Sequence, residues 1–261
     1  MANAAYRAYV INLPAARERL ERMQDRLGAI GMPWTLIEGV NGRELRLPIP
    51  EFDESAHRLM TGRRPIPAEI GCYLSHIKAI DAFLASDDRM THALIFEDDA
   101  VFGADLPPLL DAALAHADRW DVLRLSTVGR DRVLPVIPLL GNARLGVILT
   151  RCKGAAGYVV NRRAAAVFRR RLVPMRLAWD IAFDLEYLHG LTALAITPFP
   201  VVADERMPTQ IQVGINGYKL PFSRYATVFP FRAAVESARV VMRALSYARL
   251  ATDRRHPGRA G

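Results

Sequence analysis

Residues 92–100 read HALIFEDDA, an apolar run that stops on three consecutive carboxylates. The run Ala93–Phe96 is short and partly β-branched, so we expect a buried strand with Glu97, Asp98 and Asp99 at its carboxyl end. Ligands of open α/β sheets bind at that end of the strands. Three crowded negative charges repel one another, which is tolerable if they are well solvated or if a cation neutralises them. The stretch therefore predicts either a solvated turn or a ligand site.

Predicted strands and helices alternate on both sides of this run. Extended apolar segments lie at 6–13, 34–42, 120–127, 157–160 and 194–202, and helical periodicity at 15–31, 68–85, 106–117, 162–172 and 179–189. Residues 128–153 predict a loop or a β excursion. The alternation indicates the α/β class, with a mainly parallel central sheet flanked by helices.

The composition indicates a folded protein with anionic partners. The chain has 261 residues and a net charge of +8, and 32 of its 35 basic residues are arginines. This excess either records nucleotide bias in the gene or favours phosphates, acidic lipid head groups or nucleic acid. We expect no nucleic-acid partner, because no compact aromatic-basic motif is present.

The compartment is predicted from cysteine usage and from the N-terminus. Cys72 and Cys152 lie too far apart for a metal-ligand spacing, so we interpret them as reduced thiols of a cytoplasmic protein. The first residues lack the pattern of a secretory signal, and no apolar stretch reaches the roughly 18 to 20 residues of a spanning helix. Any membrane contact would be peripheral, on the cytoplasmic face of the inner membrane.

The carboxylates suit a hard divalent cation. In an extended segment residues two apart face the same side, so Glu97 and Asp99 can reach one ligand while Asp98 points elsewhere. Mg²⁺ and Mn²⁺ commonly bind one or two carboxylates together with substrate phosphates. A nucleotide diphosphate is therefore a plausible occupant.

Five motifs in order resemble glycosyltransferase family 25. They are YVINLPAARERLERM (9–23), EGVNGREL (38–45), PAEIGCYLSHIKAI (67–80), ALIFEDDAVF (93–102) and GAAGYVVNRRAA (154–165). The resemblance implies a GT-A-like nucleotide-sugar-binding fold and an inverting, metal-dependent hexosyltransferase. It also implies UDP-galactose as donor and a lipooligosaccharide or lipopolysaccharide glycan as acceptor.

The resemblance also implies site residues. The acidic metal motif falls on Glu97 and Asp99, with Asp98 between them. Donor-binding positions fall on Asn12, Leu13, Arg17 and Asn41, and we also expect Asp98 there. Ser75 and His76 match the family's Ser-His element and are further candidates for donor binding, with a structural role as the alternative. Lys78 is a candidate because its charge, like that of Arg17, could assist the leaving diphosphate, and a solvated surface charge is the alternative for both. Asn41 stands where the family commonly has aspartate, and Glu69 matches a further family position without a clear role.

An inverting transfer needs a base for the incoming hydroxyl. Asp180, Asp184 and Glu186 lie in the predicted helix 179–189, and Asp180 and Asp184, four apart, would share one face. Asp180 matches the family's late aspartate, and the alternative for it is a helix N-cap. Beyond Asp204 the chain departs from the family pattern, which often has a glutamine and a small hydroxylated residue there. Gln210 or Gln212 would take the place of that glutamine.

We expect a glycosyltransferase domain at 1–221 and a basic amphipathic helix with a disordered tail at 222–261. On a helical wheel Arg232, Glu236, Arg239 and Arg243 form one stripe, opposite apolar residues. The helix would lie on an anionic membrane or pack on the domain.

Two other functions fit the residues less well. One is a metal-dependent phosphohydrolase or nucleotidyltransferase that uses the same acidic cluster. The other is a non-catalytic basic membrane-binding protein, which the intact acidic triplet argues against.

Overall fold

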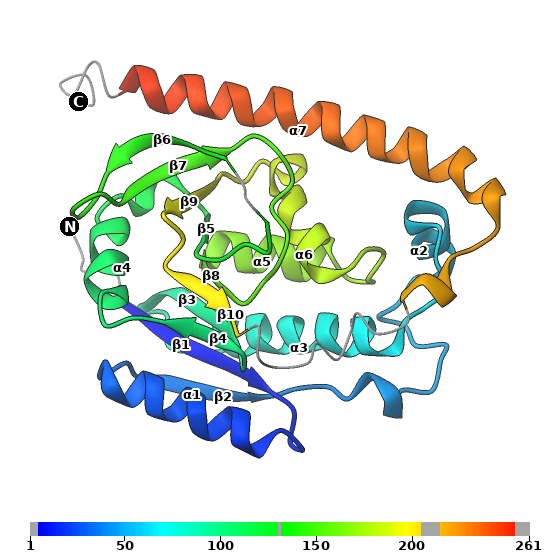
Figure 1. Ribbon diagram of the computed structural model, residues 1–261, viewed down its shortest axis with the longest axis horizontal. Helices are drawn as coiled ribbons and strands as arrows, with labels where there is room; N and C mark the ends of the chain where they lie inside the picture. Colours follow the sequence, from blue (N-terminus) through cyan, green and yellow to red (C-terminus); the bar gives the residue numbers. More distant parts are fainter. Residues whose placement is uncertain (1–4, 130–131, 205–214, 254–261) are drawn as a thin grey trace.

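The computed structural model describes residues 5–129, 132–204 and 215–253, and these form a central sheet covered by helices (Figure 1). The eight strands follow the order β2-β1-β3-β8-β5-β9-β7-β6. The α/β class predicted from the alternation of elements is confirmed. The predicted tail beyond residue 253 lies outside the described residues.

The N-terminal half contains parallel β-α units. Strand β1 (Ala5–Asn12) pairs in parallel with β2 (Trp34–Glu38) on one side and with β3 (Met90–Glu97) on the other. Helix α1 (Arg17–Ala29) connects the first pair, and α3 (Pro67–Leu84) precedes β3. Pro67 occupies the first turn of α3, where a missing N–H costs nothing. The chain between β2 and α3 forms η1 (Gly42–Glu44) and α2 (Glu54–Thr61).

The sheet is mixed, so the prediction of a mainly parallel sheet is wrong. Three of its seven strand pairings are parallel and four are antiparallel. The hairpin of β6 (Val133–Pro138) and β7 (Arg144–Ile148), which confirms the predicted β excursion, returns the chain without a crossover helix. Strand β8 (Gly157–Asn161) therefore enters antiparallel between β3 and β5 (Val122–Arg124).

The remaining elements cover the sheet and its edges. Strand β9 (Ala193–Thr197) pairs with β5 and β7, and β4 (Ala100–Phe102) forms a separate ribbon with β10 (Val201–Ala203). The helices are α4 (Leu106–Leu114), η2 (Ala117–Arg119), α5 (Arg162–Arg171), α6 (Trp179–Ala182), η3 (Phe183–His189), η4 (Ile215–Tyr218), η5 (Phe222–Arg224) and α7 (Tyr225–Asp253).

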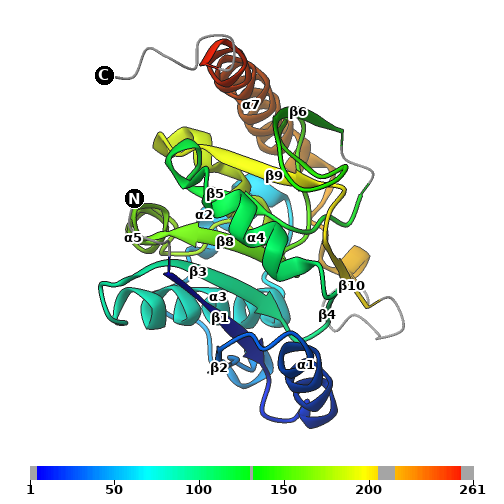
Figure 2. The same cartoon turned by 90° about the vertical axis from the view of Figure 1, so that its left-hand side faces the viewer.

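Two apolar clusters fill the space on either side of the sheet (Figure 2). Residues of α3 and α5 belong to one cluster, and residues of α1 and α4 belong to the other. Residues Ala93–Phe96 of β3 are fully buried and contribute alternately to both clusters. A strand covered on both faces needs apolar residues throughout, which explains the unbroken run before Glu97.

The segment 179–189 is not one regular helix, contrary to the prediction. Helix α6 ends at Ala182, η3 follows, and Leu185 has non-helical backbone angles. The tighter winding of a 3₁₀ segment changes the angle between successive side chains. Asp180 and Asp184 therefore have different surroundings.

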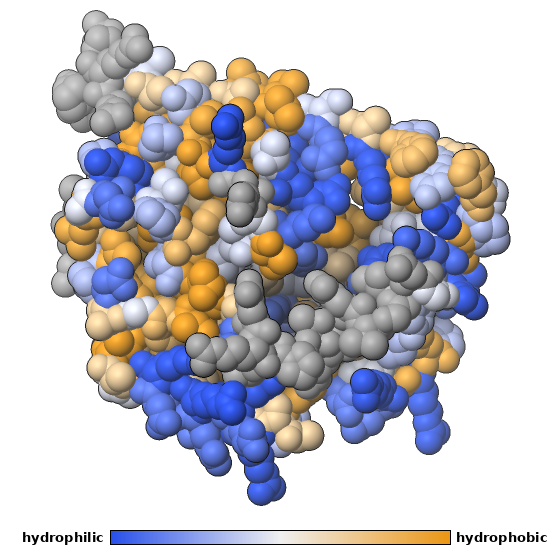
Figure 3. All heavy atoms as spheres, in the orientation of Figure 1, coloured by the Kyte–Doolittle hydropathy of each residue, from blue (hydrophilic) through white to orange (hydrophobic). Residues whose placement is uncertain are grey.

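Helix α7 buries two arginines of its charged stripe and exposes apolar residues. Arg239 is 0% exposed and Arg243 is 5% exposed, whereas Leu245 is 61% exposed. In Figure 3 hydrophobic residues lie along the upper edge of the molecule, where α7 runs. The sequence left open whether this helix lies on a membrane or packs on the domain, and these two arginines face the domain. Every helix in the described part of the chain is too short or too polar to cross a bilayer.

Buried carboxylates explain this orientation. Arg243 donates to Glu186 at 3.0 and 2.8 Å and to Asp184 at 2.9 Å, and it also reaches the carbonyl oxygens of Ile148 and Thr150. Arg239 lies 3.2 Å from the second oxygen of Asp184. Burial opposes the charge of Arg243, but the two carboxylates hold its pKa above the ordinary value. These ion pairs bind α7 to η3.

We predict that Arg243→Met lowers the free energy of unfolding by about 3–5 kcal/mol, because it leaves buried carboxylates without their counter-charge. The loss should shrink as the pH falls, since burial raises the pKa of Glu186, and this carboxylate, left without Arg243, then takes up a proton and becomes neutral. Urea unfolding at several pH values measures both effects. Arg249→Met, on the exposed side of α7, is the control, and an equal loss in this control would contradict the prediction.

Candidate functional site

The three carboxylates of the opening motif lie at the carboxyl end of β3, and each has different surroundings. Asp98 accepts a hydrogen bond from the Asn12 side chain at 2.8 Å and pairs with Arg19 at 3.0 Å. Burial raises the pKa of Asp98, although both of these contacts act against the increase. Asp98 thus fastens the end of β3 to the end of β1 and to α1. Arg17, the arginine predicted for this edge, is exposed, and Arg19 takes the position beside the acids.

Asp99 holds an unsatisfied buried oxygen. Its Oδ1 atom has no hydrogen-bond partner among the described residues. Burial raises the pKa of Asp99 to about 7, and the charges of Glu97 and Asp98 add to the increase. A buried acceptor without a donor is costly, and a bound cation removes this cost. The observation favours the cation site over the solvated turn.

Glu97 contacts α3. Its carboxylate lies 3.2 Å from Nε2 of His76, and Nδ1 of the same ring lies 3.0 Å from the Tyr158 hydroxyl. The His76 ring also stacks on Trp179, with 5.0 Å between the ring centroids and 7° between the planes. The imidazole is therefore held in one orientation. The structure brings His76, a predicted donor-binding residue, to the acidic motif.

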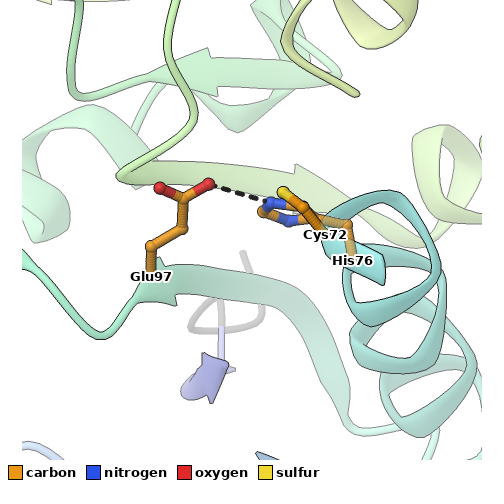
Figure 4. A group of neighbouring side chains, drawn as sticks. All are labelled: Cys72, His76 and Glu97. Atoms are coloured by element: carbon orange, nitrogen blue, oxygen red, sulfur yellow. Dashed lines mark hydrogen bonds and ion pairs between the residues drawn. The ribbon is translucent and has the colours of Figure 1, made fainter. Parts of the chain in front are cut away.

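Cys72 completes a group that the sequence analysis did not identify. Cys72 and His76, one turn apart on α3, both point toward Glu97 at the end of β3 (Figure 4). The ligand atoms of the three residues lie within 4.8 Å of one another. Burial raises the pKa of the Cys72 thiol, and the charge of Glu97 adds to this. The spacing Cys-x-x-x-His on a predicted helix was the available signal.

The Gly-Val-Asn-Gly turn is packed against the start of α3. A Cβ atom on Gly42 would lie 1.7 Å from the carbonyl oxygen of Pro67, and one on Gly71 would lie 2.5 Å from that of Val40. Ser75 accepts a hydrogen bond from the Val40 N–H and donates one to the Gly71 carbonyl. Ser75 therefore fixes this turn, instead of pointing freely toward a ligand.

Three further predicted donor-binding residues lie around the ends of β1 and β2. Asn41 caps η1 through its side chain, which accepts from the Arg43 N–H. Leu13 lies against Gly39. Lys78 donates to the carbonyl oxygen of Glu38 at 2.6 Å, and this places it on the β2 side of α3.

Asp180 lies near the acidic motif. Its carboxylate accepts a hydrogen bond from the Gly154 N–H at 3.2 Å. Its charge raises the pKa of the Cys72 thiol, as the charges of Glu97 and Glu69 do. The cap of α6 is Ala178, so the N-cap alternative for Asp180 is wrong. Asp180 and Glu97 thus both lie near Cys72 in the first half of α3, which also carries Glu69.

Asp184 and Glu186 belong to a different part of the molecule. Both are buried in the ion pairs with Arg243, and Asp184 also accepts from the Cys152 N–H. Burial raises the pKa of Glu186 in spite of Arg243. Through these contacts both residues attach α7 to the rest of the fold. Gln210 and Gln212 lie outside the described residues.

The chain matches a family model over its N-terminal half. The model of glycosyltransferase family 25, described as LPS biosynthesis protein, matches residues 5–134. This range contains the acidic motif, the first two strands and the whole of α3.

Two relatives show similarity over longer segments. The lacto-N-neotetraose biosynthesis glycosyltransferase LgtE of Neisseria meningitidis is 24% identical over 187 residues, which are 67% of this chain and 64% of that protein. Procollagen galactosyltransferase 1-A of Xenopus laevis is 28% identical over 174 residues, which are 60% of this chain and 27% of that protein. The matched part thus spans just under two thirds of one relative and about a quarter of the other.

Among solved structures, one of a Drosophila β-1,4-galactosyltransferase 7 mutant in complex with manganese, UDP-Gal and xylobiose superposes with a TM-score of 0.40. The two are 11% identical, and the match covers 85% of this chain and 79% of that one. At this TM-score the likeness carries no argument about the site.

Proposed function

Because the chain belongs to glycosyltransferase family 25, we propose that it transfers galactose from UDP-galactose to a lipopolysaccharide-type glycan with inversion at the anomeric carbon. Residues 1–221 would form the GT-A-like donor-binding domain, and residues 222–261 the basic amphipathic C-terminal segment. We further propose that the protein works in the cytoplasm.

The observation that carries the proposal is the buried, unpartnered oxygen of Asp99 beside Glu97. A carboxylate in this state repels an anionic ligand unless a cation lies between them. The diphosphate of a nucleotide sugar is an anionic ligand that commonly binds with Mg²⁺ or Mn²⁺. The two carboxylates and the diphosphate would then share one cation.

The donor set fits such a cation. Glu97 and Asp99 offer carboxylate oxygens, which suit Mn²⁺ or Mg²⁺, and His76 offers a ring nitrogen already oriented by Tyr158. When bound there, the cation would stabilise the negative charge that develops on the leaving diphosphate. Asp98 would contribute by holding Asn12 and Arg19 at the same edge of the sheet.

Asp180 would act as the base. The acceptor hydroxyl attacks the anomeric carbon as the bond to the diphosphate oxygen breaks, and its proton passes to the Asp180 carboxylate. The hydrogen bond from the Gly154 N–H holds this carboxylate in place. Asp184 is unsuited to the role, because its oxygens are occupied by Arg239 and Arg243.

We predict that UDP raises the melting temperature of the protein only when Mn²⁺ or Mg²⁺ is present. Asp99→Asn should reduce transfer at least about a hundredfold, since it removes a cation ligand worth several kcal/mol. Without metal the same variant should be no less stable than the wild type, because it removes a buried unpaired charge. Differential scanning fluorimetry and a coupled transfer assay measure these effects.

Asp25→Asn, on the exposed face of α1, is the matched control for the Asp99 variant. Full transfer in the presence of a chelator would refute the metal role. Rapid hydrolysis of UDP-galactose without an acceptor, with no transfer when acceptors are supplied, would favour the phosphohydrolase alternative.

We predict that Asp180→Asn slows transfer about 10²–10⁴-fold while UDP binding with Mn²⁺ stays unchanged, as expected for loss of a general base. The amide can still accept from the Gly154 N–H, so the fold should be preserved. Asp184→Asn is the comparison, and it should reduce stability more than the rate per folded molecule. A larger rate effect from Asp184→Asn, measured at equal folded concentration, would reverse the assignment.

We propose that the exposed apolar side of α7 makes a peripheral contact with an anionic membrane. The support is the exposure of Val240, Val241, Met242 and Leu245 in a protein with a net charge of +8. Because Arg239 and Arg243 are engaged inside, the apolar side chains would supply most of this contact. Deleting the helix would strip Asp184 and Glu186 of their counter-charges, so point substitutions are the suitable test.

We predict that the double variant Val241→Gln, Leu245→Gln binds vesicles containing phosphatidylglycerol at least about tenfold more weakly than the wild type, since each buried side chain contributes about 1.5–3 kcal/mol. Vesicle co-sedimentation measures the affinity. Leu59→Gln, an exposed leucine on α2, is the control. Wild-type binding that is absent, or that is unchanged in the double variant, would refute the membrane contact.

A further inference from the structure

A cavity rich in cationic residues lies between α2, α6 and the first half of α7. Its volume is about 280 Å³, and its walls come from the end of α2, the segment 177–185 and residues 219–239. Figure 1 shows these three helices on the same side of the molecule. Six basic side chains line it: Arg63, Arg151, Lys219, Arg224, Arg232 and Arg239. No carboxylate lines the cavity among the described residues.

Three of these six cations form ion pairs with carboxylates that do not line the cavity. Arg63 pairs with Glu69 at 2.8 Å, Arg151 pairs with Glu236, and Arg239 pairs with both Glu236 and Asp184. The Nε atoms of Arg151 and Arg239 are buried and have no hydrogen-bond partner among the described residues.

The other three cations have no carboxylate partner within the described ranges. Arg224 donates to the carbonyl oxygen of Leu220 and to the Tyr225 hydroxyl, and no ion pair is formed by Lys219 or Arg232. Three like charges around one cavity repel one another, so the empty arrangement is unfavourable. An anion placed among them relieves this repulsion and accepts charge-assisted hydrogen bonds.

The cavity also has apolar walls. Ile181 and Leu185 line it on the α6 side, and Val228 and Phe231 line it on the α7 side. Apolar walls beside the cations suit an anionic group that is attached to a larger organic body. A free inorganic ion would use only the cations.

The cavity adjoins the proposed reaction centre. Ile181 directly follows Asp180, the proposed base, on α6. Arg63, which also lines the cavity, pairs with Glu69 on α3, and the charges of Glu69 and Asp180 interact. A molecule anchored in the cavity would therefore extend toward the residue that would accept its proton.

We propose that this cavity binds an anionic group, a phosphate or a carboxylate, carried by the glycan acceptor. The proposal rests on the transferase function and adds the acceptor's chemical class: a negatively charged glycan whose anionic group is held by Lys219, Arg224 and Arg232. Anchoring there would position the acceptor hydroxyl at Asp180, which reduces the entropic cost of bringing the reactants together.

Binding of small anionic sugars to the full chain tests the proposal. Glucose 6-phosphate, glucuronate and glucose are each titrated by calorimetry in chelator, so that anions do not bind through a divalent cation. We expect one of the two anions, or both, to bind at least about tenfold more tightly than glucose, and the better one identifies the acceptor group. Equal affinities for all three sugars would overturn the proposal.

The variant Lys219→Gln, Arg232→Gln locates the binding. Both side chains are exposed, so their substitution leaves the buried ion pairs intact. We expect this variant to lose the preference for the anionic sugar, and Arg22→Gln, Arg89→Gln, with the same change in net charge, to retain it. Anionic-sugar binding that is equal in the two double variants would overturn the proposal.

Binding of UDP with Mn²⁺ to the same variants separates this proposal from the transferase function. If the anion pocket is separate from the donor site, UDP affinity should be equal in both double variants and the wild type. Failure of UDP to bind the wild type would count against the transferase function but would not contradict the anion site. Loss of UDP binding in Lys219→Gln, Arg232→Gln alone would place the cavity in the donor site and overturn the acceptor assignment.

Discussion

The repulsion among Glu97, Asp98 and Asp99 is the constraint on which the arrangement of the site depends. The chain relieves this repulsion in two places and leaves it in a third. Arg19 and Asn12 compensate Asp98, and His76 approaches Glu97. Asp99 retains a buried oxygen without a donor and a pKa of about 7. Elements from three parts of the chain, β1 with α1, α3, and β3, are thereby held at one edge of the sheet.

Helix α3 connects this edge to the core. One side of it packs in the apolar cluster with α5, and its Cys72 and His76 lie close to Glu97 of the acidic motif. Close approach to the turn before η1 requires the absence of a side chain at Gly71. The stacking of His76 on Trp179 then joins α3 to the segment that carries Asp180. A rigid scaffold of this kind holds reactive groups more precisely than a loop does.

In helix α7, too, compensation of buried charges outweighs the burial of apolar side chains. A helix that turned Val241 and Leu245 inward would bury more hydrocarbon, but it would leave Asp184 and Glu186 without cations. Each uncompensated buried charge costs about 3–5 kcal/mol, so two such carboxylates together outweigh the about 1.5–3 kcal/mol that each apolar side chain contributes. The buried pairs therefore decide the orientation of the helix. The same orientation brings Arg232 and Arg239 to the cavity beside α6.

The sequence by itself determined the α/β class, the β excursion and the position of the acids at the end of a buried strand, because these depend on apolar periodicity and on neighbouring residues. The family resemblance marked His76 as a candidate donor-binding residue, and only the folded structure shows that it meets Glu97. Tertiary structure alone decided that β8 runs antiparallel, that Arg19 rather than Arg17 meets Asp98, and that Arg239 and Arg243 of α7 face inward. A helical wheel separates the two faces of α7 but does not say which one is buried. That choice depended on Asp184 and Glu186, which lie more than fifty residues away in the chain and meet Arg243 only in the folded protein.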